Sequence, residues 1–119
     1  MNKQTEILPP EEKLLNAIFG EPLEGHRCRS EVNGVTLKQA IEAALYALTP
    51  RQIDIIYMRF GFNDRVESGM TYKKVGEAFG ITGGRIRQIT MTALRRLRHP
   101  SRSHQLKAYL EDEHADKGN

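Results

Sequence analysis

The stretch from Thr71 to Pro100 constrains this chain more than any other part of it. It predicts two short helices joined by a turn at Gly80, where a left-handed backbone costs glycine nothing, with Thr71 and Thr82 as N-caps. The segment from Gly80 to Tyr109 contains no Asp or Glu. Its basic residues are Arg85, Arg87, Arg95, Arg96, Arg98, Arg102 and Lys107. This pattern is typical of a helix-turn-helix, which places its second helix in the DNA major groove while basic side chains meet phosphates.

The spacing of small and branched residues supports the same arrangement. We expect Gly76 to let the two helices cross closely, and Ile86 and Ile89 to anchor the second helix in the core. A generic helical hairpin shares part of this pattern, but here the caps, the turn and a basic outer face coincide. The segment therefore favours DNA binding.

Charge is divided unevenly along the chain. Residues 1–70 carry 8 Lys and Arg against 10 Asp and Glu, whereas residues 71–119 carry 10 against 5. This asymmetry indicates a nucleic-acid face in the C-terminal part, although a basic run can also be a solvated helix face. No apolar run approaches the roughly 20 residues of a membrane span, and no signal peptide opens the chain. The sequence predicts a soluble cytoplasmic protein.

The remaining sequence predicts an all-α small helical bundle with a helix-turn-helix. Pro10–Phe19 has amphipathic helical spacing, Thr36 and the Thr49-Pro50 pair start further helices, and no segment has a strand period. We expect an N-terminal tail, helix and linker over 1–35, including a linker from Glu21 to Gly34. A helix-turn-helix domain over 36–113 and a disordered tail over 114–119 follow.

Catalytic chemistry is not indicated. No glycine-rich phosphate loop follows a strand, and no Ser–His–Asp or Cys–His set is suggested. Cys28 is the only cysteine. His26 lies close to it, but nothing completes a zinc site. We expect no enzyme activity, no metal and no other cofactor.

Residues 48–112 resemble region four of the housekeeping class of bacterial sigma factors. The matching segments are LTPRQ, MRFG, TYKKVGEAFGIT, RIRQI, ALRRLRHPSRS and LKAYLED. The resemblance implies a helix-turn-helix domain of the winged-helix-like superfamily. It also implies binding to the −35 promoter element and docking on the flap of the RNA polymerase β subunit. The protein is then expected in the bacterial nucleoid, and a phage or mobile element is a possible source of its gene.

The resemblance also implies particular contacts. Arg51, Arg85 and Arg87 match arginines that serve the phosphate backbone and groove, and Gln88 matches a glutamine that reaches base edges. The full expected DNA-binding set is Arg51, Tyr72, Thr82, Gly83, Gly84, Arg85, Arg87, Gln88, Met91 and Arg95. The expected flap-binding set is Phe60, Leu97, Leu106, Tyr109 and Leu110, although Phe60 and Leu97 also suit a core. Leu106, Tyr109 and Leu110 are expected on a helix from Ser103 to Glu113.

The departures from the family are informative. Gly83 and Gly84 occupy positions where the family has an arginine and a glutamate that read bases, so recognition of the usual element should be weak or altered. Thr92 replaces a basic position that meets activators. Residues 1–47 resemble no sigma segment that binds the clamp or melts DNA. The sequence thus predicts a partial sigma factor.

The N-terminal helix carries a second, shorter resemblance. PEEKLLNAIFGE, from Pro10 to Glu21, is similar to a segment of the bacterial RNA polymerase β subunit and departs mainly at Asn16. This similarity implies a polymerase-mimicking docking element. The alternative is an ordinary amphipathic helix that packs on the domain or stays free.

Three functions therefore remain open. The first is a split sigma factor or sigma-like regulator that contacts upstream DNA and the flap. The second is an autonomous helix-turn-helix repressor or activator, although no dimer helix is visible for its two half-sites. The third is a protein-only antagonist that occupies the flap.

Overall fold

The computed structural model describes residues 9–20, 27–62 and 69–111. Within these ranges the chain forms six helices and four strands of two residues each. The helices are α1 (Pro10–Phe19), α2 (Leu37–Leu45), α3 (Pro50–Phe60), α4 (Tyr72–Phe79), α5 (Gly83–Arg98) and α6 (Pro100–Lys107). The strands are β1 (Arg27–Cys28), β2 (Glu31–Val32), β3 (Val35–Thr36) and β4 (Leu110–Glu111). The prediction of a helical bundle with a helix-turn-helix is confirmed.

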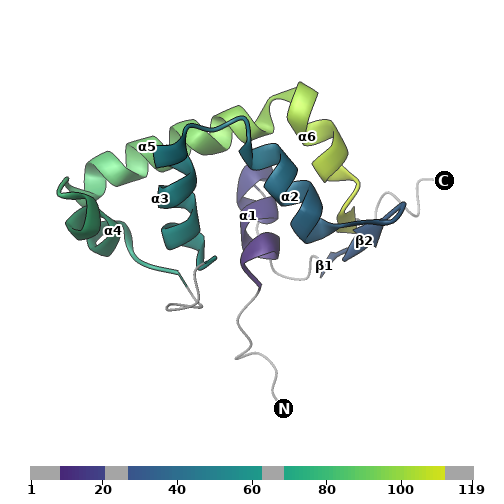
Figure 1. Cartoon of the computed structure of the whole chain (residues 1–119), viewed down its shortest axis with the longest axis horizontal. Coiled ribbons are helices and arrows are strands. Elements are labelled where there is room, and N and C mark those ends of the chain that lie inside the picture. Colours follow the sequence, from purple (N-terminus) through teal and green to yellow (C-terminus); the bar gives the residue numbers. More distant parts are fainter. Residues whose placement is uncertain (1–8, 21–26, 63–68, 112–119) are drawn as a thin grey trace, which may run out of the picture.

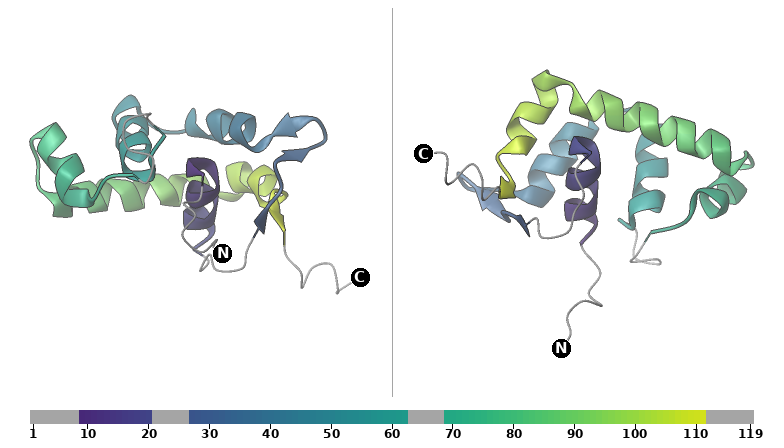
Figure 2. Two further views of the ribbon diagram at one scale, coloured as in Figure 1. Left: turned by 90° about the horizontal axis from the view of Figure 1, so that it is seen from below. Right: turned by 180° about the vertical axis from the view of Figure 1, so that it is seen from behind.

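The longest helix, α5, organises the fold (Figure 1). It runs along one side of the molecule, with α4 at its N-terminal end and α6 turning back from its C-terminal end. The helices α3, α1 and α2 lie beneath it, and α1 is placed between α2 and α3 both from the front and from behind (Figures 1 and 2). None of the described helices is long and apolar enough to cross a membrane.

Threonine caps determine where four of the helices begin. Thr36 and Gln39 form a reciprocal capping box at α2, as do Thr49 and Gln52 at α3. The hydroxyl oxygens of Thr71 and Thr82 accept from the third amide of α4 and of α5, at 3.1 and 3.0 Å. Each cap satisfies an amide that has no partner inside its helix. The predicted cap positions are confirmed.

Two apolar clusters form the core. The first joins α1, α2, α3, α5 and α6, and the second lies under the helix-turn-helix around Ile55, Val75 and Ile86. Helix α3 contributes Ile56 to the first cluster and Ile55 to the second, so it connects them. Helical spacing in the sequence predicts a buried stripe of Ile53, Ile56, Tyr57 and Phe60 on α3. Ile56 is buried, but the other three are only half-buried, and Ile55, outside the predicted stripe, is fully buried. A helix packed on two sides has no single apolar face.

The predicted linker from Glu21 to Gly34 is wrong where the structure describes it. Strands β2 and β3 form a hairpin around Asn33 and Gly34, whose φ angles are 52° and 84°. An Asn-Gly pair with positive φ at both positions is the preferred two-residue hairpin turn, because its twist matches that of the strands. Strand β1 pairs antiparallel with β4 and so joins residues near the two ends of the described chain.

The C-terminal helix also differs from expectation, whereas the N-terminal helix has the predicted bounds, Pro10–Phe19. The predicted helix from Ser103 to Glu113 is instead α6, Pro100–Lys107, because Pro100 suits a first helical position and the chain then turns into β4. The core includes α1, with Leu14, Leu15 and Ile18 fully buried, and thus extends beyond the predicted domain of 36–113. The predicted C-terminal tail, 114–119, and residues 1–8 of the predicted N-terminal region, 1–35, lie outside the described residues.

Candidate nucleic-acid interface

A tight turn sets the angle between α4 and α5. Gly80 has a φ of 73°, and the amide of Ile81 donates to the carbonyl of Gly76 at 3.0 Å. A Cβ atom at Gly76 would collide with the carbonyl oxygen of Ile81. Gly76 is therefore required by the turn that follows its own helix. The same Cβ atom would lie 3.1 Å from the nitrogen of Gly83, the first residue of α5, so the prediction that Gly76 lets the two helices lie close together is also confirmed.

The first turns of α5 present polar side chains to solvent. Arg85, Arg87 and Gln88 are all exposed, and the Arg85 guanidinium donates to the Gln88 side-chain oxygen at 3.2 Å. Further along the helix Arg95 is exposed, and Met91 retains 41% of its surface, which is unusual for a large apolar side chain. This face of α5 has the length and chemistry to enter a major groove.

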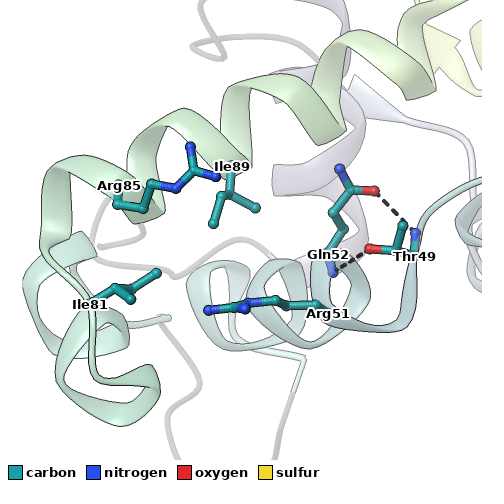
Figure 3. Close-up of a pocket in the computed structure, with 6 residues that line it drawn as sticks. All are labelled: Thr49, Arg51, Gln52, Ile81, Arg85 and Ile89. Carbon is teal, nitrogen blue, oxygen red and sulfur yellow. Dashed lines mark hydrogen bonds between the residues drawn. The ribbon is translucent and has the colours of Figure 1, made fainter.

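A cavity of about 420 Å³ separates the start of α3 from α5. Arg51 extends from α3 and Arg85 from α5, on opposite sides of it (Figure 3). Its remaining lining residues are Thr49, Gln52, Ile81 and Ile89. Two guanidinium groups at one cavity suit an anionic oxygen, because their positive charges favour it. The cavity is therefore a candidate phosphate site.

Tyr72 and Thr82, two of the predicted DNA contacts, also make interactions within the protein. The ring of Tyr72 is half-buried against the second cluster, and the Arg59 guanidinium lies 4.3 Å from its centroid. The hydroxyl oxygen of Thr82 accepts from the amide of Arg85 and caps α5. Both residues lie at the edge of the α5 face, but these interactions stabilise the protein.

The two glycines at the start of α5 are not equivalent. A Cβ atom at Gly83 would lie 3.1 Å from the backbone nitrogen and Cα of Lys73, closer than ordinary van der Waals contact. A Cβ atom at Gly84 would meet only the Thr82 hydroxyl oxygen, at 3.9 Å. The glycine at 83 thus allows α5 to approach α4 closely, whereas position 84 is open.

The structure adds Lys73 and Lys74 to the candidate interface. Both are exposed in the first turn of α4, and the backbone of Lys73 is next to the start of α5. The sequence prediction missed them, although two lysines directly after the Thr71 cap were a readable signal. These two exposed lysines are candidates for phosphate contacts beside α5.

The basic run of α5 and α6 divides into two groups. Arg96 donates to the carbonyl of Ala47 at 3.2 Å, Arg98 to that of Ile18 at 2.6 Å, and Arg102 to that of Arg96 at 2.8 Å. These three guanidiniums hold segments of the fold together. The exposed Arg85, Arg87 and Arg95 are left as the stronger candidates for nucleic acid.

The residues expected to bind the flap are inside the protein. Leu97, Leu106 and Tyr109 are 0%, 1% and 4% exposed, and Phe60 and Leu110 are half-buried. All five belong to, or pack against, the first cluster, which also holds the apolar side of α1. The Tyr109 hydroxyl donates to the carbonyl of Val35 at 2.6 Å. In this structure the five residues form core rather than an open surface, and their contact with the flap stays a prediction.

Residues 44–99 match the family described as Sigma-70, region 4. The chain is 49% identical over 75 residues to RNA polymerase sigma factor SigA of Listeria monocytogenes and to that of Listeria innocua, covering 63% of this chain. It is 48% identical over 75 residues to RNA polymerase sigma factor SigA of a Bacillus species. The chain spans about a fifth of the length of these relatives.

The matched range contains α4 and α5, the two helices of the helix-turn-helix. It also contains the start of α3 and the cavity between α3 and α5. The identity to the relatives lies well above what fold similarity alone produces. This chain therefore contains a sigma region-four-like domain, a helix-turn-helix DNA-binding domain of transcription.

Proposed function

We propose that this protein binds upstream promoter DNA, of the −35 type, and the β flap of RNA polymerase. In this role it acts as a partial or split sigma factor or a sigma-like regulator. The observation that carries the DNA part is that Arg51 from α3 and Arg85 from α5 line one cavity, while Arg87 and Gln88 are exposed on the same helix as Arg85. The proposed role would be carried out in the bacterial cytoplasm.

The proposed DNA contacts divide by chemistry. Arg51 and Arg85 meet phosphates at the cavity and fix the position of α5 on the duplex. Gln88 reads a base, because its amide pairs well with the donor and acceptor of adenine. Gly83 and Gly84 offer no side chain, and each missing base contact removes about 1–3 kcal/mol of discrimination. Binding is therefore strong in phosphate contacts and poor in sequence selection.

The polymerase contact is supported by the resemblance of residues 48–112 to sigma region four and by relatives named as RNA polymerase sigma factors. The proposed flap-binding residues are Phe60, Leu97, Leu106, Tyr109 and Leu110. Leu97, Leu106 and Tyr109 are buried and Phe60 and Leu110 half-buried, so the contact requires the buried side chains to become accessible.

Two binding measurements test the proposal. The first is capture of core RNA polymerase and of the isolated β flap domain by the full chain. The second is binding of duplex DNA carrying an upstream promoter element, by the native chain and by the Arg87→Ala, Gln88→Ala double variant. We expect capture of polymerase, and DNA binding that the double variant loses.

Other outcomes select the alternatives. DNA binding without any polymerase capture indicates an autonomous helix-turn-helix repressor or activator. Polymerase capture with no DNA binding indicates an antagonist that occupies the flap and uses its arginines only for solubility. Failure of both measurements would overturn the sigma-like role and the antagonist, and would leave a regulator whose operator differs from this duplex.

A further inference from the structure

The outer side of α5 carries an exposed methionine. The core side of this helix is marked by the fully buried Ile86, Ala93 and Leu97. Positions 84, 88, 91 and 95 follow the spacing of one helical face on the opposite side, and all four residues there are exposed. Met91 keeps 41% of its surface on this outer side.

The surroundings of Met91 are polar and positively charged. Gln88 lies one turn before it and Arg95 one turn after it, and Arg87 is also exposed. The segment from Gly80 to Tyr109 contains no Asp or Glu. A single exposed apolar side chain is ordinary on a protein surface, and one without apolar neighbours does not form a protein-binding patch. The charges around Met91 instead favour DNA as the molecule that covers it.

The surface before Met91 is open. Gly84 lies two turns earlier on the same side, and a Cβ atom there would meet only the Thr82 hydroxyl oxygen, at 3.9 Å. A glycine permits close approach of its backbone to a ligand. The start of α5 can therefore come closer to the floor of a groove than a helix with a side chain at this position. A closer approach brings the side chain of Met91 within reach of the bases.

The chemistry of Met91 fits one group in the major groove. The base edges there carry hydrogen-bond donors and acceptors, and the apolar exception is the C5 methyl group of thymine. A thioether donates no hydrogen bond and accepts only weakly, so it gains little from the polar edges. Its unbranched, flexible side chain packs well against a methyl group and adjusts to its position.

The spacing along α5 predicts which base pair is contacted. Gln88 and Met91 are three residues apart, which is about 4.5 Å along a helix axis. Base pairs are stacked at about 3.4 Å. The methyl group that Met91 contacts should therefore lie one or two base pairs from the base that Gln88 reads.

We propose that Met91 is a specificity-determining residue that recognises a thymine by its methyl group. This inference rests on the DNA contact of the proposed function and adds a base preference to it. The contact supplies selection to a helix whose first two residues, Gly83 and Gly84, offer no side chain to a base. It involves no charge, so it leaves the salt dependence of binding unchanged.

Replacement of thymine by deoxyuridine tests the contact, because it removes the methyl group and keeps the base pairing. The probes are upstream promoter duplexes in which each base pair of the bound segment is in turn T·A or A·T, with either thymine or deoxyuridine. For the native chain we expect roughly fourfold weaker binding of deoxyuridine at one or two positions, the effect of one apolar methyl group left in water. Met91→Ala should abolish this difference, and Met91→Leu, which stays apolar, should retain it.

The controls use neighbouring residues of the same helix. Thr92→Ala is an exposed change at the next position and should keep the native difference between thymine and deoxyuridine. Gln88→Ala on the same duplexes locates the base that Gln88 reads, which should lie within two base pairs of the thymine. Titrations at several salt concentrations should give Met91→Ala the native slope. Circular dichroism shows which variants are folded.

Two results would overturn the inference, and they differ from each other. Native binding that does not distinguish thymine from deoxyuridine at any position, or a difference that persists in Met91→Ala, would remove Met91 from base recognition and leave the DNA contact standing. Absence of DNA binding by the native chain on every duplex would instead overturn the DNA contact of the proposed function, and the role of Met91 with it.

Discussion

Arg98 donates a hydrogen bond from Nε to the carbonyl oxygen of Ile18, at 2.6 Å, across 80 positions of the chain. The bond joins the last turn of α5 to the last turn of α1. A carbonyl near the C-terminus of a helix lacks an intrahelical partner and carries the negative end of the helix dipole, so a guanidinium satisfies both needs. One arginine of the basic segment thus holds the N-terminal helix on the domain.

Replacing this arginine should release α1 more than it weakens the domain. We expect Arg98→Ala to lower the free energy of unfolding by about 1 kcal/mol, because a charge-assisted hydrogen bond is lost at a partly exposed site. Urea unfolding measures the change, and hydrogen exchange should locate it in α1. Arg95→Ala, an exposed change in the same turn, is the control. Equal losses in the two variants would contradict the role of Arg98.

The two glycines of α5 should respond differently to alanine. Gly84→Ala should stabilise the protein by about 0.5–1 kcal/mol, because its Cβ enters open space and alanine loses less backbone entropy in a helix. Gly83→Ala should stabilise the protein less than Gly84→Ala, or destabilise it, because the added Cβ would lie 3.1 Å from the backbone of Lys73. Thermal or urea unfolding of the two variants compares them directly, and equal effects would contradict the close approach of α4 and α5.

A longer side chain at position 84 should add base recognition. Gly84→Glu fits the open space, and a carboxylate there can accept from the exocyclic amine of a cytosine. We expect about 1–3 kcal/mol of new discrimination at one base pair, measured by binding to a panel of singly substituted promoter duplexes. An unchanged preference across the panel would show that α5 does not enter the major groove at this residue.

Salt dependence separates phosphate contacts from base contacts. Arg51→Ala and Arg87→Ala should each reduce the slope of log affinity against log salt concentration by about 0.9, because each removes one phosphate contact. Gln88→Ala should lower affinity at every salt concentration with the slope unchanged. Titrations at several salt concentrations measure all three. A slope that falls for Gln88→Ala would reverse its assignment as a base reader.

The raised pKa of Glu12 predicts the sign of a pH effect. Because folding favours the protonated carboxyl, the favourable contribution is present below the ordinary value of 4.5 and is lost as the pH rises through the folded value. At neutral pH the charge opposes docking of α1, so Glu12→Gln should be more stable than the native chain at pH 7.5 and closer to it at pH 4.5. Urea unfolding at the two pH values gives the difference, and a gap independent of pH would contradict the shift.

The proposed polymerase and DNA contacts together affect how the protein selects promoters. A chain with few base-reading side chains selects promoters poorly by itself. Under the proposed function, its specificity depends on being held beside promoters by the polymerase. Selection of promoters would then follow from assembly rather than from recognition of bases.

Local chemistry was sufficient to locate most of the helices. The caps at Thr36, Thr49, Thr71 and Thr82 and the turn at Gly80 were predicted because capping and left-handed turns depend on residues within about four positions. The same reasoning found the exposed residues of α5, since an outer face follows from helical spacing. The Asn33-Gly34 pair also indicates a hairpin turn, but the charged residues around it favour a linker when the sequence is considered alone.

Long-range packing could not be obtained in this way. Leu106 and Tyr109 share a core with α1, which lies about 90 positions earlier in the chain. The amphipathic pattern of α1 does not indicate which segment it packs against. The division of the arginines is of the same kind, because Arg85 and Arg98 have identical side chains and differ only in the carbonyls near them. Sequence determines which faces are apolar or charged, and the tertiary contacts determine which of those faces remain open to a partner.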